Sequence, residues 1–178
     1  MNQPEHVYTP PHALSAKAIP AVVAQYLNGE DLLSKMQALR LSTLDAAGWP
    51  HAALLSAGDM LALPNGRIRF ALFPQSSMAA NLLRDGRLTL TLVLAGKICE
   101  LRGRVQRLQQ TTPEVPLACL EMQVESVREH MAPYADVTTG ITFALHDPPT
   151  VLDRWRQQIA ALRGGVIQGV PEGDVIAS

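Results

Sequence analysis

The sequence predicts a mainly β fold with flanking helices, built around an antiparallel barrel of six or seven strands. Short apolar runs between residues 39 and 105 are separated by closely spaced turn signals, as in hairpin-rich sheets. Several runs also alternate with a period of two: within residues 98–108, Cys99, Leu101 and Val105 share one face. A single short helical pattern interrupts the runs, so the predicted order is strands, one helix and further strands.

The N-terminal part precedes the barrel. Residues 1–18 contain several prolines and little periodicity, which predicts an extended arm outside a single domain of residues 19–163. Residues 19–27 are predicted to form a helix with Pro20 tolerated in its first turn. The helical spacing of Leu32, Leu33, Met36 and Leu39 predicts a second short helix that leads into the first strand.

Hairpin signals order the predicted strands. Asp45-Ala46-Ala47-Gly48 and Pro64-Asn65-Gly66 each join two apolar runs, and Ala95-Gly96 joins a third pair. Gly103, inside the last of these strands, predicts a bulge or a close backbone approach. The predicted strands are residues 38–44, 50–55, 60–63, 67–73, 87–94 and 98–108, with a predicted core that includes Leu41, Leu54, Phe70, Leu90, Leu92 and Leu101.

The C-terminal third is less regular. Residues 117–127 fit a helix and a strand equally well, and residues 141–145 are predicted to form a last strand. Thr150 and Asp153 have the spacing of a capping box. An apolar stripe that includes Trp155 as a core anchor then predicts a closing helix up to Arg163. The Gly-rich segment 164–178 is predicted to be a flexible tail.

Composition limits the possible partners. The chain of 178 residues carries a net charge of −1, so no strong field directs it to nucleic acid or to an anionic membrane. Charged residues make up only 17% and apolar residues 47%, which favours a partner subunit over part of the surface. The start is polar and Pro-rich and no apolar run reaches about 18 residues, so we expect a cytoplasmic protein. Cys99 and Cys119 are expected to be buried thiols, and no metal-ligand spacing is present.

The interrupting helix carries the main candidate site. Ser76 and Ser77 precede the apolar segment that begins with Met78, and a serine there is a natural N-cap. The free backbone N–H groups of the first turn and the helix dipole can then bind an anion such as a phosphate. The alternative is a capped helix without a ligand.

This frame resembles the pyridoxamine-5′-phosphate-oxidase-like family of FMN-binding split barrels. That family has a Ser-x-Lys-x-x-Asn-Leu-like segment after a strand that ends in Phe-x-Thr. In this chain Leu72 stands where Thr is usual, and Met78 stands where Lys is usual. The better-studied oxidases also carry an Arg and a Lys one strand earlier, and residues 52–56 of this chain contain neither. The positions that match are Phe70, Ser76, Asn81 and Leu82.

The resemblance covers residues 38–108 well and implies a split β-barrel in which residues 117–127 return as a strand. It also implies a homodimer with ligand sites between the subunits, and an FMN-dependent oxidoreductase in which the flavin supplies the redox chemistry. No side chain can be named as a catalytic acid or base. The cofactor-binding positions that it implies are Ser56, Leu72, Ser76, Ser77, Met78 and Asn81.

Because the Lys and Arg side chains that usually bind the FMN phosphate are absent, ligands other than FMN are also possible. A charge-assisted hydrogen bond contributes about 1.5–3 kcal/mol, so each lost contact lowers affinity by roughly ten- to a hundredfold. Weak FMN binding through the helix start, a deazaflavin or haem in the same pocket, and a non-catalytic ligand-binding or structural dimer with a degenerate pocket are the alternatives.

Overall fold

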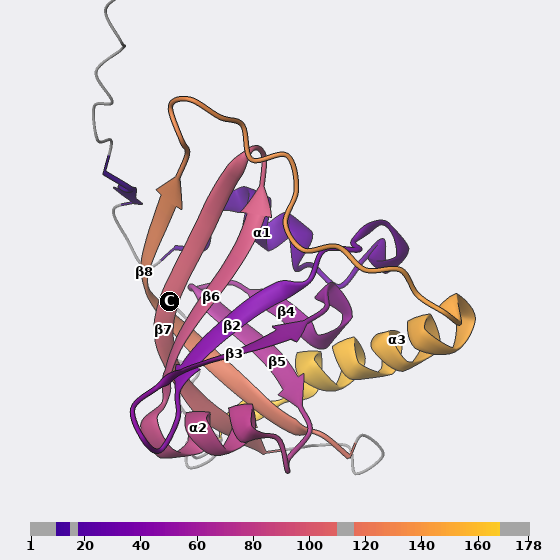
Figure 1. Ribbon diagram of the computed structural model, residues 1–178. Coiled ribbons are helices and arrows are strands. Elements are labelled where there is room, and N and C mark those ends of the chain that lie inside the picture. The colour runs from indigo at the N-terminus through magenta and orange to yellow at the C-terminus, as the bar shows by residue number, and fades with distance from the viewer. Residues whose placement is uncertain (1–9, 15–17, 110–115, 168–178) are drawn as a thin grey trace, which may run out of the picture.

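A computed structural model describes residues 10–14, 18–109 and 116–167 of the chain. It confirms a mainly antiparallel sheet with a few flanking helices (Figure 1). The strands are β1 (His12–Leu14), β2 (Leu39–Leu44), β3 (Pro50–Leu55), β4 (Met60–Leu63), β5 (Arg67–Leu72), β6 (Arg87–Leu94), β7 (Lys97–Gln109), β8 (Ala118–His130) and β9 (Val166–Ile167). The helices are α1 (Ala21–Tyr26), α2 (Ser77–Asp85) and α3 (Pro148–Gly164), with short 3₁₀ turns η1 (Leu32–Ser34) and η2 (Ala57–Asp59).

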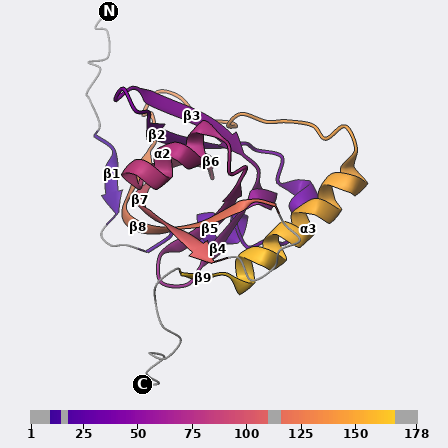
Figure 2. The same cartoon turned by 90° about the horizontal axis from the view of Figure 1, so that it is seen from below.

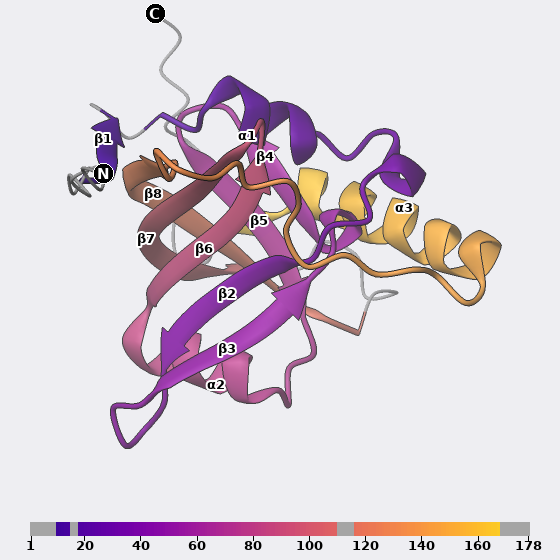
Figure 3. The same ribbon diagram turned by 45° about the horizontal axis from the view of Figure 1, so that its top comes forward.

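The sheet curls into a half-barrel. Its strand order is β3-β2-β6-β7-β8-β5-β4, and every neighbouring pair is antiparallel. Viewed from below, the strands curve around a common interior, with α2 beside β2 and β3 and α3 farther along the molecule (Figure 2). The β2–β3 hairpin loop extends beyond the rest of the sheet (Figure 3). The predicted strand at residues 117–127 is confirmed as part of β8.

The barrel interior is the main hydrophobic core. Strand alternation directs every second side chain inward, and five predicted core residues are fully or almost fully buried: Leu41, Phe70, Leu90, Leu92 and Leu101. The sixth prediction, Leu54, is wrong, because its side chain is 50% exposed. β3 ends the strand order, and its inward positions are Ala53 and Leu55 instead.

The prediction for Gly103 is confirmed. The register between β7 and β8 shifts between Arg102 and Gly103, which marks a bulge. A Cβ at Gly103 would lie 2.1 Å from the carbonyl oxygen of Gln123, so only glycine allows the backbones to approach this closely.

Three local predictions need correction. The second helix is only the 3₁₀ turn η1, because β2 takes over from Leu39. The predicted strand at 141–145 contributes one isolated bridge, between Thr142 and Gln37. α3 begins earlier than the predicted capping box, since Asp147 is its N-cap and accepts a hydrogen bond from the backbone N–H of Thr150.

Both predicted terminal segments contain short strands. β1 pairs with β8 inside the predicted N-terminal arm, and β9 pairs with β7 inside the predicted tail. The pairing of β9 extends to Ile167, opposite Leu108 of β7. The rest of the predicted tail, residues 168–178, lies outside the described residues.

Candidate functional site

The start of α2 has the arrangement expected of an anion-binding helix end. Ser76 is the N-cap: its hydroxyl accepts the backbone N–H of Ala79 at 3.2 Å, and its carbonyl accepts that of Ala80 at 3.1 Å. Within the described part of the chain, the first-turn N–H groups of Ser77 and Met78 have no hydrogen-bond partner. α2 ends at Gly86, whose φ of 74° is the left-handed conformation of a helix C-terminus.

A cavity of about 440 Å³ opens beside this helix end. Its walls come from β3, η2, the end of β5, the start of α2, the segment before β8, and α3. The size suits a small organic ligand, and most of the lining is apolar. The apolar lining residues are Ala53, Leu54, Leu55, Ala71, Leu72, Phe73, Met78, Pro116 and Leu117, and the polar ones are Asp59, Ser76, Arg154, Gln157 and Gln158.

The polar groups from α3 were not predicted. Arg154 and Gln158 are four residues apart and therefore lie on one face of the helix. Gln158 is only 5% exposed, yet its side-chain oxygen has no hydrogen-bond partner among the described residues. Arg154 is exposed and forms no ion pair there, whereas Arg156 is paired with Asp153 at 2.7 Å. The only sequence signal was a glutamine inside the apolar stripe of α3, three residues after Trp155.

Buried contacts hold α3 against the sheet. Trp155 is 2% exposed and packs over Gly58, where a Cβ would lie 2.0 Å from the indole ring. At the other end of the helix, Arg69 of β5 donates to the carbonyl of Leu162 at 2.8 Å. The same guanidinium is paired at 2.7 Å with Glu121 of β8, and both side chains are buried. These contacts fix where Arg154 and Gln158 lie relative to the cavity.

The structure divides the predicted cofactor-binding residues. Leu72, Ser76 and Met78 line the cavity together. Ser77 is exposed at the helix start, and its backbone N–H has no hydrogen-bond partner among the residues that the structure describes. The other two side chains have internal partners: the hydroxyl of Ser56 bonds the carboxylate of Asp59, and Asn81 donates to Thr43 at 3.1 Å.

Met78 occupies the position of the family's lysine but belongs to the barrel core. It is 2% exposed and packs in the main hydrophobic cluster while also contributing to the cavity wall. The side chain at this point is therefore apolar, and the backbone N–H groups in the first turn of α2 are groups that could donate to an anion there.

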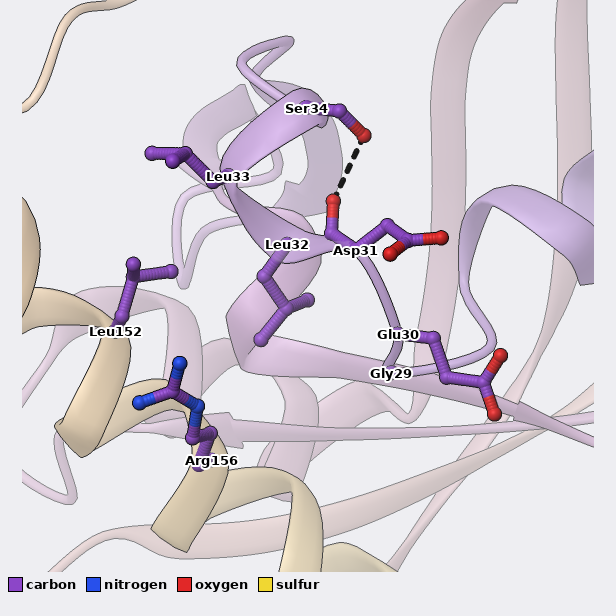
Figure 4. A pocket seen from close by; sticks show the side chains of 8 residues that line it. All are labelled: Gly29, Glu30, Asp31, Leu32, Leu33, Ser34, Leu152 and Arg156. Carbon is purple, nitrogen blue, oxygen red and sulfur yellow. Dashed lines mark hydrogen bonds between the residues drawn. The ribbon is translucent and has the colours of Figure 1, made fainter.

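A second, wider cavity of about 710 Å³ lies between η1 and α3 (Figure 4). Leu33 and Leu152 line it together with Arg156, and the carboxylates of Glu30 and Asp31 extend away from α3. It contains none of the predicted site residues, and its described lining includes no buried polar atom without a hydrogen-bond partner. The cavity beside α2 is the better candidate site.

The described residues were also compared with the requirements for a reactive cysteine, a metal site and a membrane-spanning helix. Burial raises the pKa of the Cys99 and Cys119 thiols, which disfavours the reactive thiolate. No group of three or more His, Cys, Asp or Glu side chains there could hold a metal ion. Across the same residues, no helix has the length and apolar character needed to span a membrane.

Comparison with known protein sequences identifies a relative of this chain. No family model matches the chain. The chain is 34% identical over 147 residues to the uncharacterized protein YclD of Bacillus subtilis (strain 168), covering 78% of this chain and 92% of that protein. The chain belongs to the YclD family.

Among solved structures, a candidate pyridoxamine 5′-phosphate oxidase from Lactobacillus delbrueckii matches with a TM-score of 0.50 and 14% identity, over 65% of this chain and 97% of that one. The HupZ protein of Group A Streptococcus matches with a TM-score of 0.49 and 13% identity, over 71% and 100%. The first match confirms the predicted fold for this member of the YclD family: it is the split barrel of pyridoxamine-5′-phosphate-oxidase-like proteins.

Proposed function

We propose that this protein binds FMN in the cavity beside α2 and acts as a flavin-dependent oxidoreductase. The observation that carries the proposal is the composition of the cavity. Ser76 and Met78 at the start of α2 line one part of its wall, apolar side chains of β3 and β5 form another, and polar side chains of α3 complete it. Each part of FMN matches one part of this wall: the anionic phosphate matches the start of α2, the largely apolar ring system matches β3 and β5, and the polar ring edge matches α3.

The phosphate would lie against the N–H groups of Ser77 and Met78. These donors have no hydrogen-bond partner in the described part of the chain, and the positive end of the helix dipole lies at the same point. Without the usual Lys and Arg, we expect weaker binding than in the better-studied oxidases. The ring would lie against Leu55 and Leu72, away from water.

The bound flavin would supply the electron-transfer chemistry. The protein's own groups would bind it, orient it and exclude water. The carboxylate of Asp59 is already held by the backbone N–H of Ser56 at 2.9 Å and by the Ser56 hydroxyl, so no free acid or base faces the cavity from η2.

A homodimer is part of the proposal. Leu54 and Phe73 line the cavity and are 50% and 68% exposed. A second copy over this region would cover these side chains and narrow the mouth of the cavity. Leu88, Leu90 and Leu92 of β6 lie in the barrel core, so these side chains do not contribute to such a contact. Sedimentation at micromolar concentration should give twice the 19.3 kDa chain mass.

The test uses Ser77, the first residue of α2. Proline is favoured at this position and removes the backbone N–H, so Ser77→Pro should delete one phosphate donor while leaving the helix intact. FMN affinity should fall roughly ten- to a hundredfold, and riboflavin affinity should not change, because riboflavin lacks the phosphate. Fluorescence titration of the apoprotein measures both.

Ser77→Ala is the matched control, since it keeps the N–H and should bind FMN like the wild type. Equal FMN and riboflavin affinities in all three proteins would contradict a phosphate site at α2. Absence of FMN binding by the wild-type apoprotein, or co-purification of haem instead, would favour the non-flavin alternatives.

A further inference from the structure

We infer that Gln158 and Arg154 of α3 recognise the imide edge of a heterocyclic ligand, the ring segment in which one N–H lies between two carbonyl groups. The inference rests on the proposed function, because it assigns the polar end of the same cavity. It goes further by selecting the chemical class of the ligand: a flavin or a deazaflavin has this edge, and a haem does not.

Gln158 is the central observation. Its side chain is 5% exposed and lines the cavity, and its oxygen has no donor within the described residues. A buried acceptor without a partner costs about 1–3 kcal/mol, so such groups are uncommon unless something outside the chain completes them. A ligand N–H would supply the missing donor. The amide NH₂ group of the same side chain could then donate to the neighbouring ring carbonyl.

Arg154 supplies the second half of the pair. On a helix, residues four apart have Cβ atoms about 5–6 Å apart, which lets both side chains reach one edge of a small ring. A guanidinium has only donors, so it suits the other carbonyl and not the N–H. Arg154 has no ion-pair partner in the described part of the chain, whereas Arg156 is paired with Asp153 and Arg163 donates to the carbonyl of Asn28.

The same two residues discriminate against haem. Haem presents carboxylates at its edge, which only accept hydrogen bonds when ionised. They could pair with Arg154, but they would leave the Gln158 oxygen facing another acceptor. The carboxylate of Asp59 in the same cavity would add like-charge repulsion. The imide edge satisfies both α3 side chains at once.

The test compares riboflavin with 3-methylriboflavin, in which a methyl group replaces the imide hydrogen. The wild type should bind riboflavin about tenfold more tightly or better, the loss expected for one unpaired buried acceptor. Gln158→Leu should bind the two ligands alike. Gln157→Leu, next to it on α3 and also beside the cavity, should discriminate like the wild type.

Neither ligand carries a phosphate, so the result does not depend on the α2 site. Equal affinities in the wild type, or discrimination that persists in Gln158→Leu, would overturn the inference while leaving FMN binding intact. Discrimination between 5-deazariboflavin and its 3-methyl derivative, without any FMN binding, would support the inference and overturn the FMN proposal. No binding of riboflavin or 5-deazariboflavin would overturn the inference, and no binding of FMN as well would overturn both proposals. An unfolding midpoint of the apoprotein at or above that of the wild type shows that Gln158→Leu is folded, because the change removes an unpaired buried acceptor.

Discussion

The two helices that border the cavity are positioned in different ways. The α2 side is local: the cap, the free donors and the cavity-lining Ser76 and Met78 all fall within a few consecutive residues. The α3 side depends on contacts between distant parts of the chain, since Arg69 meets Glu121 across 52 residues and the carbonyl of Leu162 across 93. A local motif can be recognised in a sequence, whereas a helix docked by distant contacts becomes part of a site only through the fold.

This comparison predicts different sensitivities. The α3 side should lose its geometry when a buried tertiary contact is removed, even far from the cavity. The α2 side should respond mainly to changes in its own first turn. The following mutations test the distant contacts of α3 and the first turn of α2 separately, in order of decreasing expected effect on stability.

The largest effect is expected from Arg69→Met. This change leaves the buried Glu121 carboxylate without its closest partner and removes the donor to the last turn of α3, which together should lower the free energy of unfolding by about 3–5 kcal/mol. Urea denaturation measures the loss. The more distant Arg67, at 3.6 Å from Glu121, cannot replace the 2.7 Å pair.

The matched control is Arg156→Gln, which breaks an exposed ion pair on the same helix and should cost about 0.5 kcal/mol or less. The double variant Arg69→Met with Glu121→Met should recover much of the loss, because no buried charge is then left unpaired. Arg69→Met losses as small as those of the control would refute the idea that this ion pair docks α3.

The second test is Gly58→Ala. The added methyl would lie 2.0 Å from the ring of Trp155, which has no room to move in its buried position, so overpacking should cost about 1–3 kcal/mol. A shift of α3 away from η2 should also weaken riboflavin binding. Gly48→Ala is a less crowded comparison, since nothing lies within 4 Å of its Cβ position, although its φ of 85° adds backbone strain of its own.

The double variant Gly58→Ala with Trp155→Phe tests whether overlap with the indole ring causes the loss of stability. The smaller ring should relieve part of the overlap and restore some stability. If Gly58→Ala is as stable as the wild type, Trp155 and η2 do not fix the position of α3.

The sequence predicted the strands because their alternation and turns are local properties. It also predicted the Ser76 cap and the bulge at Gly103, since each depends on a few neighbouring residues. It failed at Leu54, because a period of two does not say which face of an edge strand is covered. The strand predicted at residues 141–145 failed for a related reason: an apolar run forms a ladder only if a sheet edge pairs with more than one of its residues.

The candidate site was predictable on one side only. Leu72, Ser76 and Met78, which the resemblance implied, line one cavity, whereas the side chains of Asn81 and Ser56 have partners in Thr43 and Asp59 that no local pattern reveals. Arg154 and Gln158 carry no motif. Their relevance depends on how α3 packs against η2 and β5, which a single sequence does not encode in any local pattern.

The smallest expected effect compares the caps of the two helices directly. Ser76→Ala removes a side-chain cap with a bond of 3.2 Å and should lower stability by about 1 kcal/mol. Asp147→Ala removes an exposed cap whose bond to Thr150 is 3.5 Å long, so the loss should be smaller, at about 0.5 kcal/mol. Only Ser76→Ala should also weaken FMN binding, because only that cap orders the donors beside the cavity. Chemical denaturation gives the two stabilities, and titration with FMN and riboflavin gives the affinities. If both caps matter equally for FMN, the phosphate does not lie at α2, and the local side of the site would lose its assigned role while the α3 side kept its own.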